Sequence, residues 1–422
     1  MRQQTWIFCQ TILTKLKRYV HSKSFFYTLN LKLTFFSLIF FAIGAFTSIT
    51  ISSISHILIL SPCIYFTYLF LKENKKESLN YFSLSQWCLL GLILLMIFSI
   101  LFFWLRYDDS LKHFFKFKFF LLPLLGVFAY REAFEKYIDL KKRKILLHLL
   151  FISTSVASVS GLLAVILGFN PIKSHTELFE GRNSGLFYIQ PYSYGLSLFL
   201  IVLTGLIIHR EKIKEYIKTP ALITYWVVNF LGLYFTYTRG AWISYFLPLP
   251  FFFLRKKHFI KVLMLGLSTI LLSIVFNPMA KERFLDNSSS ITSRIELFKA
   301  ALYAFSEKPI LGWGFDNFQK NVPYLKEKYN LGRRDVVLKS HNNYLETLVN
   351  LGIFGFIFLV LFHFSWAYEG FKSKTWIGEI NFVFVISLVL SGMVDTTWVM
   401  PEILFFIMTT YSFMIAAKIK KI

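Results

Sequence analysis

Long apolar segments recur along almost the whole chain, and they restrict its possible folds more than any other feature. A run of about 20 mostly apolar residues is long enough to cross the hydrocarbon core of a membrane as an α-helix. Hydrophobic residues make up 55% of the 422 residues, which is more than a soluble globular protein usually carries. The alternating hydropathy typical of a membrane β-barrel is absent. The sequence therefore predicts an all-α integral membrane protein.

About twelve segments have the length and the hydropathy of transmembrane helices. In chain order they cover residues 33–51, 53–71, 87–105, 114–130, 146–168, 189–208, 221–238, 240–254, 259–277, 343–366, 376–394 and 401–417. The eighth segment is short and contains Pro248 and Pro250, which indicates a kink or a partial span. We expect an N-terminal bundle of about nine spans over residues 1–277, one large loop over 278–342, and about three C-terminal spans over 343–422.

The net charge of +23 would suggest a nucleic acid partner in a soluble protein. In a membrane protein, lysine and arginine accumulate on cytoplasmic loops and contact anionic lipids. With both termini in the cytoplasm, basic clusters such as KKRK at 141–144 and RKK at 255–257 lie on the cytoplasmic side. Long loops cross the membrane largely regardless of their charge, so the basic residues of the loop 278–342 do not argue against an outer location. We therefore expect membrane lipids and no nucleic acid as partners, with the large loop on the outer face.

The large loop has a helical pattern of its own. Apolar residues at helical spacing predict a helix over 293–307, for which Thr292 or Ser293 is the expected N-cap. A second short helix is expected over 317–330, close to the membrane surface, where Trp313 also fits.

Arg239, in the stretch FTYTRGAW, lies at the outer end of the seventh predicted span. An arginine at the membrane interface is costly unless it is paired, and its planar guanidinium is suited to phosphate oxygens. The alternative is an arginine that anchors the span by extending into the headgroup region. Gly240 beside it permits close approach of a ligand, which favours a functional role.

His341, in KSHNNYLE, immediately precedes the tenth predicted span. Histidine exchanges a proton near neutral pH, and a helix N-terminus disfavours its charged form, so the ring is a candidate base. Taken alone, a histidine at a helix start is more often a cap or an interface residue. Asn342 or Asn343 is expected to cap this helix.

Three further candidates fall on the same outer side. By spacing alone, Arg294 at the start of the loop helix is an ordinary surface arginine. Arg182 before the sixth span is either a membrane anchor or part of a site. Asp395, before the last span, is expected to orient His341, to pair with an arginine, or to cap the last helix.

Several signatures of cofactor and metal sites are absent. The chain has no phosphate-binding P-loop, no dinucleotide-binding glycine pattern and no H-E-x-x-H motif. The cysteines Cys9, Cys63 and Cys88 fit neither a disulfide framework nor a zinc site. The candidate site is therefore rich in arginine and histidine, and we expect no metal and no cofactor. Such a site favours an anionic substrate, and a lipid-linked phosphate is a natural one at a membrane.

The ordered set TYTRGAW, SRIELFKAALYAFSEKPILGWGFDNF and SHNNYLETLVNLGIFGF resembles the O-antigen ligase and polymerase superfamily. The resemblance covers about residues 182–402, and the first five spans match in general topology only. Within the superfamily, the chain looks most like the lipid A-core O-antigen ligases of Gram-negative inner membranes. The HNNYLE form and the G-x-G turn are shared with O-antigen polymerases, so they do not separate the two activities.

The resemblance implies a glycosyltransferase that works at the periplasmic face without metal or nucleotide. Its donor would be a glycan on undecaprenyl diphosphate, and its acceptor a sugar hydroxyl of lipid A-core. Arg239 matches the essential arginine of the family, His341 its essential histidine, and Arg294 the arginine that opens the loop helix. Asp395 resembles an acid before the last span, and Arg182 an arginine before the sixth.

The resulting hypothesis is an inverting, metal-independent glycosyl transfer. Arg239, helped by Arg294 and Arg182, would hold the diphosphate, and His341 would act as general base on the acceptor hydroxyl. Asp395 would orient the imidazole, and Asn342 would cap the helix or bind sugar. An O-antigen polymerase is the nearest alternative. A transporter or flippase is the alternative of another class, and it predicts charged residues near the membrane midplane.

Overall fold

A computed structural model of the chain describes residues 24–73, 82–107, 116–173, 181–254, 289–332 and 338–419, with a few single positions between 261 and 281. The secondary structure of these residues is helical, without a β-strand. Seven of the described helices are long and apolar enough to cross a membrane. The predicted all-helical class is confirmed, whereas the count of twelve spans stays a prediction.

Most of the described helices are long, and they pack as neighbours in a bundle. The helix Ser24–Gly44 is followed by α2 (Ile49–Glu73), α3 (Leu84–Tyr107), α4 (Lys118–Lys136), α5 (Leu140–Leu167), α6 (Ile189–Ile208), α7 (Arg210–Ile213), α8 (Thr219–Tyr234), α9 (Arg239–Phe246), the 3₁₀ helix η3 (Leu249–Phe253), α12 (Ser289–Glu307), α13 (Phe318–Lys328), α14 (Asn343–Ser373), α15 (Trp376–Val394), the 3₁₀ helix η4 (Thr397–Val399) and α16 (Pro401–Ile419).

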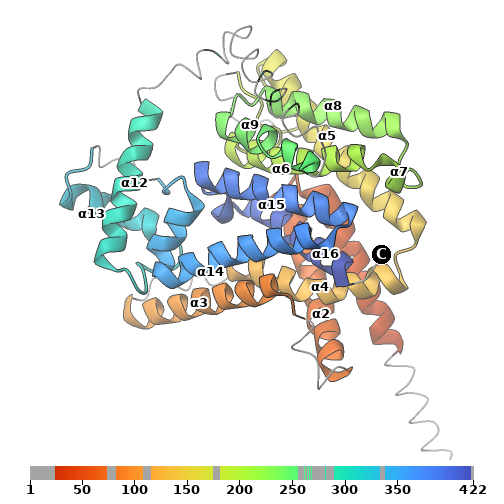
Figure 1. The fold of residues 1–422 in the computed structure, drawn as a ribbon, viewed down its shortest axis with the longest axis horizontal. Helices are drawn as coiled ribbons and strands as arrows, with labels where there is room; N and C mark the ends of the chain where they lie inside the picture. Colours follow the sequence, from red (N-terminus) through yellow and green to blue (C-terminus); the bar gives the residue numbers. More distant parts are fainter. Residues whose placement is uncertain are drawn as a thin grey trace, which may run out of the picture.

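The bundle has two groups of helices that meet at α15. On one side, α14 packs between α15 and α3, and α4 packs against α16 and α2. On the other side, α6 contacts α15, α8 and α9, and α8 packs against α5. Figure 1 shows α12 and α13 at the end of the molecule opposite the C-terminus. The polar residues singled out in the sequence analysis lie between this end and the two groups of helices.

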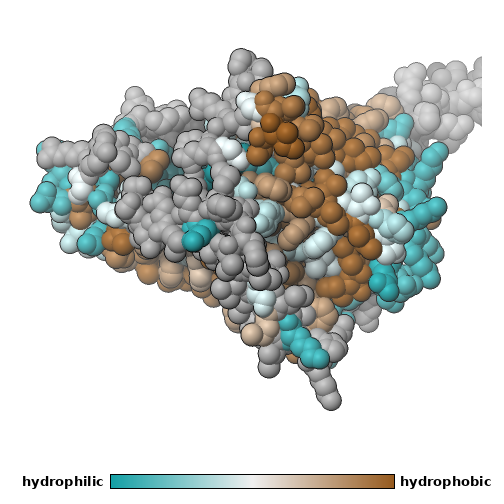
Figure 2. Space-filling view, turned by 90° about the horizontal axis from the view of Figure 1, so that it is seen from above, coloured by the Kyte–Doolittle hydropathy of each residue, from teal (hydrophilic) through white to brown (hydrophobic). Residues whose placement is uncertain are grey.

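Large apolar side chains cover much of the outer surface of the bundle. Ile57 on α2 is 72% exposed and Phe364 on α14 is 66% exposed, as expected for side chains that face lipid. In the space-filling view, hydrophobic residues gather in the middle of the visible face, and hydrophilic residues gather toward its two ends (Figure 2). The surface therefore has the pattern of a protein that crosses a membrane.

The predicted boundaries of the first two spans are wrong. The break was expected at residue 52, but the first helix ends at Gly44 and α2 begins at Ile49. The amides of Thr47 and Ser48 both donate to the Gly44 carbonyl at this turn. Serines and threonines follow this turn, but no charged residue or proline adjoins it, so hydropathy did not place the break there.

Other predicted spans agree more closely with the structure. Segments 189–208 and 376–394 coincide with α6 and α15. Segment 114–130 is shifted, because α4 extends to Lys136 through a charged last turn. The interruption expected at Pro248 is confirmed, since α9 ends at Phe246 and a 3₁₀ helix follows. Most of the ninth predicted span, the RKK cluster and Cys9 lie outside the described residues.

Both helices expected in the large loop are present, as α12 and α13. They share a small core of their own, formed by Leu297, Ala300, Ala301, Ala304, Phe318, Val322, Leu325 and Val349. The predicted caps Thr292 and Ser293 lie inside α12, which begins at Ser289, so that expectation is wrong. The helix extends one turn further because serines and an isoleucine precede the apolar stripe without a breaking residue.

The span expected over 343–366 is interrupted within α14. Gly352 has φ 68° and ψ −167°, a conformation that essentially only glycine adopts. The preceding carbonyls are turned toward the loop: Val349 accepts from the amide of Trp313 at 2.8 Å, and Asn350 accepts from that of Gly314 at 3.1 Å. The break therefore docks the GWG turn, and with it α12 and α13, onto the first part of α14.

Candidate functional site

One cavity of about 340 Å³ brings together four of the predicted site residues. Arg182 lies before α6, Arg239 begins α9, Arg294 lies on α12, and Asp395 follows α15, and all four line this cavity. They come from separate parts of the chain, so only the tertiary fold places them together. Three guanidinium groups face a single carboxylate among these four, a combination that favours an anionic ligand.

Arg239 lies at a helix N-terminus and also lines the cavity. It is the first residue of α9, whose N-cap residue Thr238 makes no side-chain capping bond. The first amides of a helix have no partner within it, and the helix dipole is positive at this end. Thr238 and Gly240 line the cavity beside Arg239, and Arg239 makes no hydrogen bond or ion pair with any other described residue. Its guanidinium is therefore available to a ligand, as an anion site at a helix N-terminus requires.

Arg182 is held in place from behind. Its Nε donates to the carbonyl of Thr236 at 2.7 Å, and its Nη2 donates to Oγ1 of Thr238 at 2.9 Å. Burial, and next the nearby charge of Arg239, lower the pKa of Arg182 below its usual range. Two arginines that disfavour each other's charge are stabilised together by a bound anion.

Arg294 reaches the cavity from the separate core of α12 and α13. Its Nη1 donates to the carbonyl of Val394, the last residue of α15, at 3.4 Å. The carbonyls at a helix C-terminus have no helical partner, and an arginine there also complements the dipole. This contact links the loop helices to the end of α15, next to Asp395.

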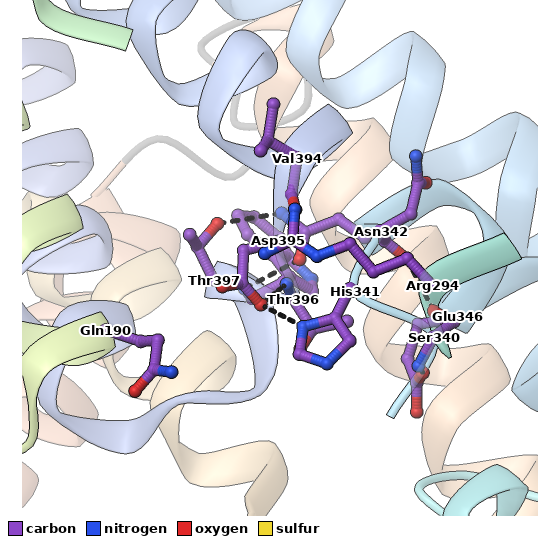
Figure 3. A network of polar contacts seen from close by, with 12 residues as sticks. Gln190, Arg294, Ser340, His341, Asn342, Glu346, Val394, Asp395, Thr396 and Thr397 are labelled. Carbon is purple, nitrogen blue, oxygen red and sulfur yellow. Dashed lines mark hydrogen bonds and ion pairs between the residues drawn. The ribbon is translucent and has the colours of Figure 1, made fainter. Parts of the chain in front are cut away.

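His341 and Asp395 form a polar pair at the edge of the cavity (Figure 3). The Nδ1 atom of His341 lies 3.0 Å from Oδ1 of Asp395, whose side chain is only 2% exposed. The same Oδ1 accepts from the amide of Thr396 at 2.8 Å. An ionised carboxylate only accepts hydrogen bonds, so this contact suits the tautomer of a neutral imidazole that carries its hydrogen on Nδ1 and a lone pair on Nε2. The imidazole itself does not line the cavity and is connected to it through Asp395.

The backbone at His341 is held in an uncommon conformation. Its φ is 50°, in the left-handed region that few residues other than glycine adopt. The preceding amide of Ser340 donates to the buried carboxylate of Glu346 at 2.9 Å, and the Ser340 hydroxyl donates to the carbonyl of Asn342 at 2.9 Å. These bonds fix the turn that directs the imidazole toward Asp395.

The two asparagines after His341 both have structural partners. Asn342 is the N-cap of α14: its Oδ1 accepts from the amides of Tyr344 and Leu345, and its Nδ2 donates to Met393. Asn343 is buried, and its amide binds the residues after Asp395 through Thr397 Oγ1 at 2.9 Å and the amide of Trp398 at 2.8 Å. The sequence left capping and sugar binding open, and these contacts favour capping and positioning.

A buried aspartate supports the segment that leads to His341. Asp316, in the turn after the GWG sequence, has a side chain that is 8% exposed, and it forms ion pairs with Lys116 and with Lys339. Lys339 lies two residues before His341. Asp316 therefore ties the start of α4, the loop turn and the His341 segment to one point.

Sequence reasoning missed part of the cavity wall. Gln190, Tyr194 and Tyr237 line it together with the predicted residues. Gln190 lies across from the His341 and Asp395 pair in Figure 3. Tyr237 adjoins the predicted arginine in the same short stretch, but the two residues on α6 carried no polar pattern that marked them. Among the described residues, no group of three or more His, Cys, Asp or Glu side chains is placed to hold a metal ion.

The part of the chain that contains several of these residues matches a known protein family. Residues 224–360 match the family model described as O-antigen ligase. The matched region contains Arg239, Arg294 and His341, whereas Arg182 and Asp395 lie outside it. Among curated proteins, no sequence matches the chain.

The family match and the helices agree on the class of protein. Members of this family are membrane glycosyltransferase-like enzymes, either ligases or polymerases. Together with the apolar helices, the match indicates a multi-pass membrane protein. The matched segment, 137 of the 422 residues, is similar to the O-antigen ligase family.

Proposed function

We propose that this protein is an O-antigen ligase that transfers a glycan from undecaprenyl diphosphate to a sugar hydroxyl of lipid A-core. The observation that carries the proposal is the single cavity in which Arg182, Arg239 and Arg294 meet Asp395, the partner of His341. A cationic cavity next to a candidate base suits an anionic leaving group and a neutral hydroxyl nucleophile.

The three arginines would bind the diphosphate of the donor. Negative charge grows on this group as the bond to the sugar breaks, so guanidinium groups already in place stabilise the transition state more than the bound donor. The free amides at the start of α9 add positive potential beside Arg239. No metal ion is needed for this role, and the proposal is a metal-independent, inverting transfer.

His341 would act as general base toward the acceptor hydroxyl. Its contact with Asp395 leaves Nε2 as the proton acceptor and stabilises the imidazolium that forms. In an inverting transfer, the hydroxyl oxygen attacks the anomeric carbon, its proton passes to Nε2, and the diphosphate leaves with the bonding electrons. A positioned base of this kind contributes roughly 10²–10⁴-fold.

The proposed setting is the inner membrane of a Gram-negative bacterium, with about twelve spans, both termini in the cytoplasm and the cavity facing the periplasm. The distribution of basic clusters in the sequence supports this orientation, because KKRK at 141–144 lies at the end of the bundle away from the cavity. Cysteine labelling from outside tests it: a cysteine at Tyr303 on α12 should react, and one at Lys144 should not.

An O-antigen polymerase would use the same donor with a lipid-linked glycan as acceptor. A deletion strain separates the two activities. Loss of the ligase leaves lipid A-core without polymer, whereas loss of the polymerase leaves core that carries a single repeat unit. Core with a single repeat unit would contradict the ligase proposal and leave the donor site unaffected.

The transporter alternative receives no support from Glu379, a charged residue near the start of the predicted span 376–394. Its carboxylate lies 3.1 Å from Nε2 of His209, between the first turn of α15 and the end of α6. These helix ends are opposite the ends that form the cavity, so the pair belongs near the other surface and joins two helices there.

Transfer by the purified protein in vitro tests the whole proposal. The unchanged protein should transfer glycan from the undecaprenyl diphosphate donor to lipid A-core in the presence of EDTA. Full activity of Arg239→Ala or His341→Ala would contradict the assignment of the site. Loss of turnover in EDTA, restored by a divalent cation, would contradict metal independence.

A further inference from the structure

Tyr194 is a buried tyrosine whose hydroxyl has no partner. It lies in the second turn of α6, is 1% exposed, and lines the cavity that holds the three arginines. Its hydroxyl makes no hydrogen bond with any described residue. The hydroxyl oxygen is not among the fully buried polar atoms that lack a partner in the described part of the chain, so it is open to the cavity, where a bound group can accept its hydrogen.

Other fully buried tyrosines in the same part of the molecule are hydrogen-bonded. The hydroxyl of Tyr192, two residues earlier, donates to Oγ of Ser158 at 2.8 Å. The hydroxyl of Tyr245 is 3.0 Å from Oγ1 of Thr204 and also accepts from the indole of Trp226 at 3.1 Å. These two hydroxyls have partners within the protein, whereas the Tyr194 hydroxyl at the cavity has none among the described residues.

The surroundings of the Tyr194 hydroxyl are charged. Asp395, Arg294 and Arg182 all lie within electrostatic range of its phenol. A Cβ atom at Gly240 would overlap the hydroxyl oxygen, so the absence of a side chain there makes room for it. The hydroxyl thus lies in the wall of the cationic cavity, beside the N-terminus of α9.

We propose that the Tyr194 hydroxyl donates a hydrogen bond to an anionic oxygen of the group bound in this cavity. The inference rests on the proposed function, under which that group is the diphosphate of the donor. The arginines supply charge, while a hydroxyl on a rigid helix supplies a short directional contact that orients the phosphate oxygens. Tyr194 is then a ligand-binding residue that the sequence did not indicate.

The experiment compares Tyr194→Phe with Tyr192→Phe in the purified full-length protein. Inorganic pyrophosphate and farnesyl diphosphate serve as probes, with affinity measured by calorimetry and stability by thermal unfolding. Tyr194→Phe should raise the Kd for both probes about tenfold, the loss expected for one hydrogen bond to a charged group. Its Tm without ligand should stay equal or rise, because no protein hydrogen bond is lost.

Tyr192→Phe is the matched control, since it removes a hydroxyl that is bonded within the protein. It should lower Tm and leave the Kd unchanged. If Tyr194→Phe left the Kd unchanged while Arg239→Ala strongly weakened binding of the probes, the role of Tyr194 would be overturned and the proposed diphosphate site would still be supported. A fall in Tm together with the loss of affinity would also overturn it in favour of packing. If the unchanged protein bound neither probe, the diphosphate site itself would be refuted, and the inference with it.

Discussion

The imidazole of His341 lies 3.0 Å from the carboxylate of Asp395, although 54 residues separate them in the chain. The turn before α14 and the residues at and after the end of α15 are joined by three further hydrogen bonds, between Asn342 and Met393 and between Asn343 and both Thr397 and Trp398. The pair is therefore built into the junction of two helices. A histidine oriented by a buried acid at such a junction is suited to proton transfer.

His341 and Asp395 should behave as one unit in catalysis. We expect His341→Ala to lower kcat by roughly 10²–10⁴-fold, because the acceptor hydroxyl loses its base. Asp395→Ala should lower kcat less, and the double variant should be no worse than His341→Ala alone. The measurement is a double-mutant cycle on glycan transfer. If the fold-loss in kcat of the double variant equalled the product of the two single losses, the two residues would act independently.

Replacement of Arg239 should distinguish charge from geometry. Arg239→Ala should reduce kcat/KM by about 10²–10³-fold, and Arg239→Lys should recover only part of this, since lysine lacks the planar guanidinium. Arg143→Ala is the control, because Arg143 donates to backbone carbonyls at the other end of the bundle. Full activity of Arg239→Lys would show that only the positive charge at position 239 matters and that the planar guanidinium is not required.

Gly240→Ala should impair the cavity while the fold persists. The added Cβ would overlap the Tyr194 hydroxyl and crowd Val394 from 2.7 Å, which displaces the groups around the bound anion. We expect weaker binding of pyrophosphate and lower transfer activity. Gly195→Ala in α6 is the control, because its Cβ would lie 3.3 Å from the ring of Phe46. Equal activity of the two variants would contradict the proposed crowding.

Gly352→Ala should loosen the loop helices from the bundle. The added Cβ would overlap the carbonyl of Ile310, and the backbone conformation costs a residue other than glycine about 1–3 kcal/mol. We expect a lower Tm, faster proteolysis between α12 and α13, and reduced activity because Arg294 is carried by this unit. Gly126→Ala in α4, where the Cβ would lie 3.2 Å from the Tyr130 ring, is the control and should change little. Unchanged proteolysis of Gly352→Ala would argue against the docking role of the break.

Local sequence patterns predicted several elements well. The spans at α6 and α15, the interruption at Pro248 and the helices α12 and α13 all follow from apolar periodicity and from residues that end helices. The turn after Gly44 and the break at Gly352 did not follow, because neither a charged residue nor a proline adjoins either position. In those two places, packing against another segment decides the backbone conformation.

The sequence by itself determined the chemical type of the site. The apolar segments indicated a membrane protein, and Arg239 stood out because an arginine at a membrane boundary is costly unless it is paired. By position alone, Arg294 was an ordinary surface arginine, and the order of motifs that resembles the O-antigen ligase and polymerase superfamily singled it out. Those inferences needed only residue type and position along the chain.

Only the tertiary structure decided which of these residues meet. It placed Arg182, Arg239 and Arg294 around one cavity, paired His341 with Asp395, and assigned Asn342 to the cap of α14. It also brought in Tyr194, whose burial without a partner cannot be recognised from an apolar helix sequence. The physical reason is that charge and hydrogen bonding act over a few ångströms in space, and distance along the chain does not fix that separation.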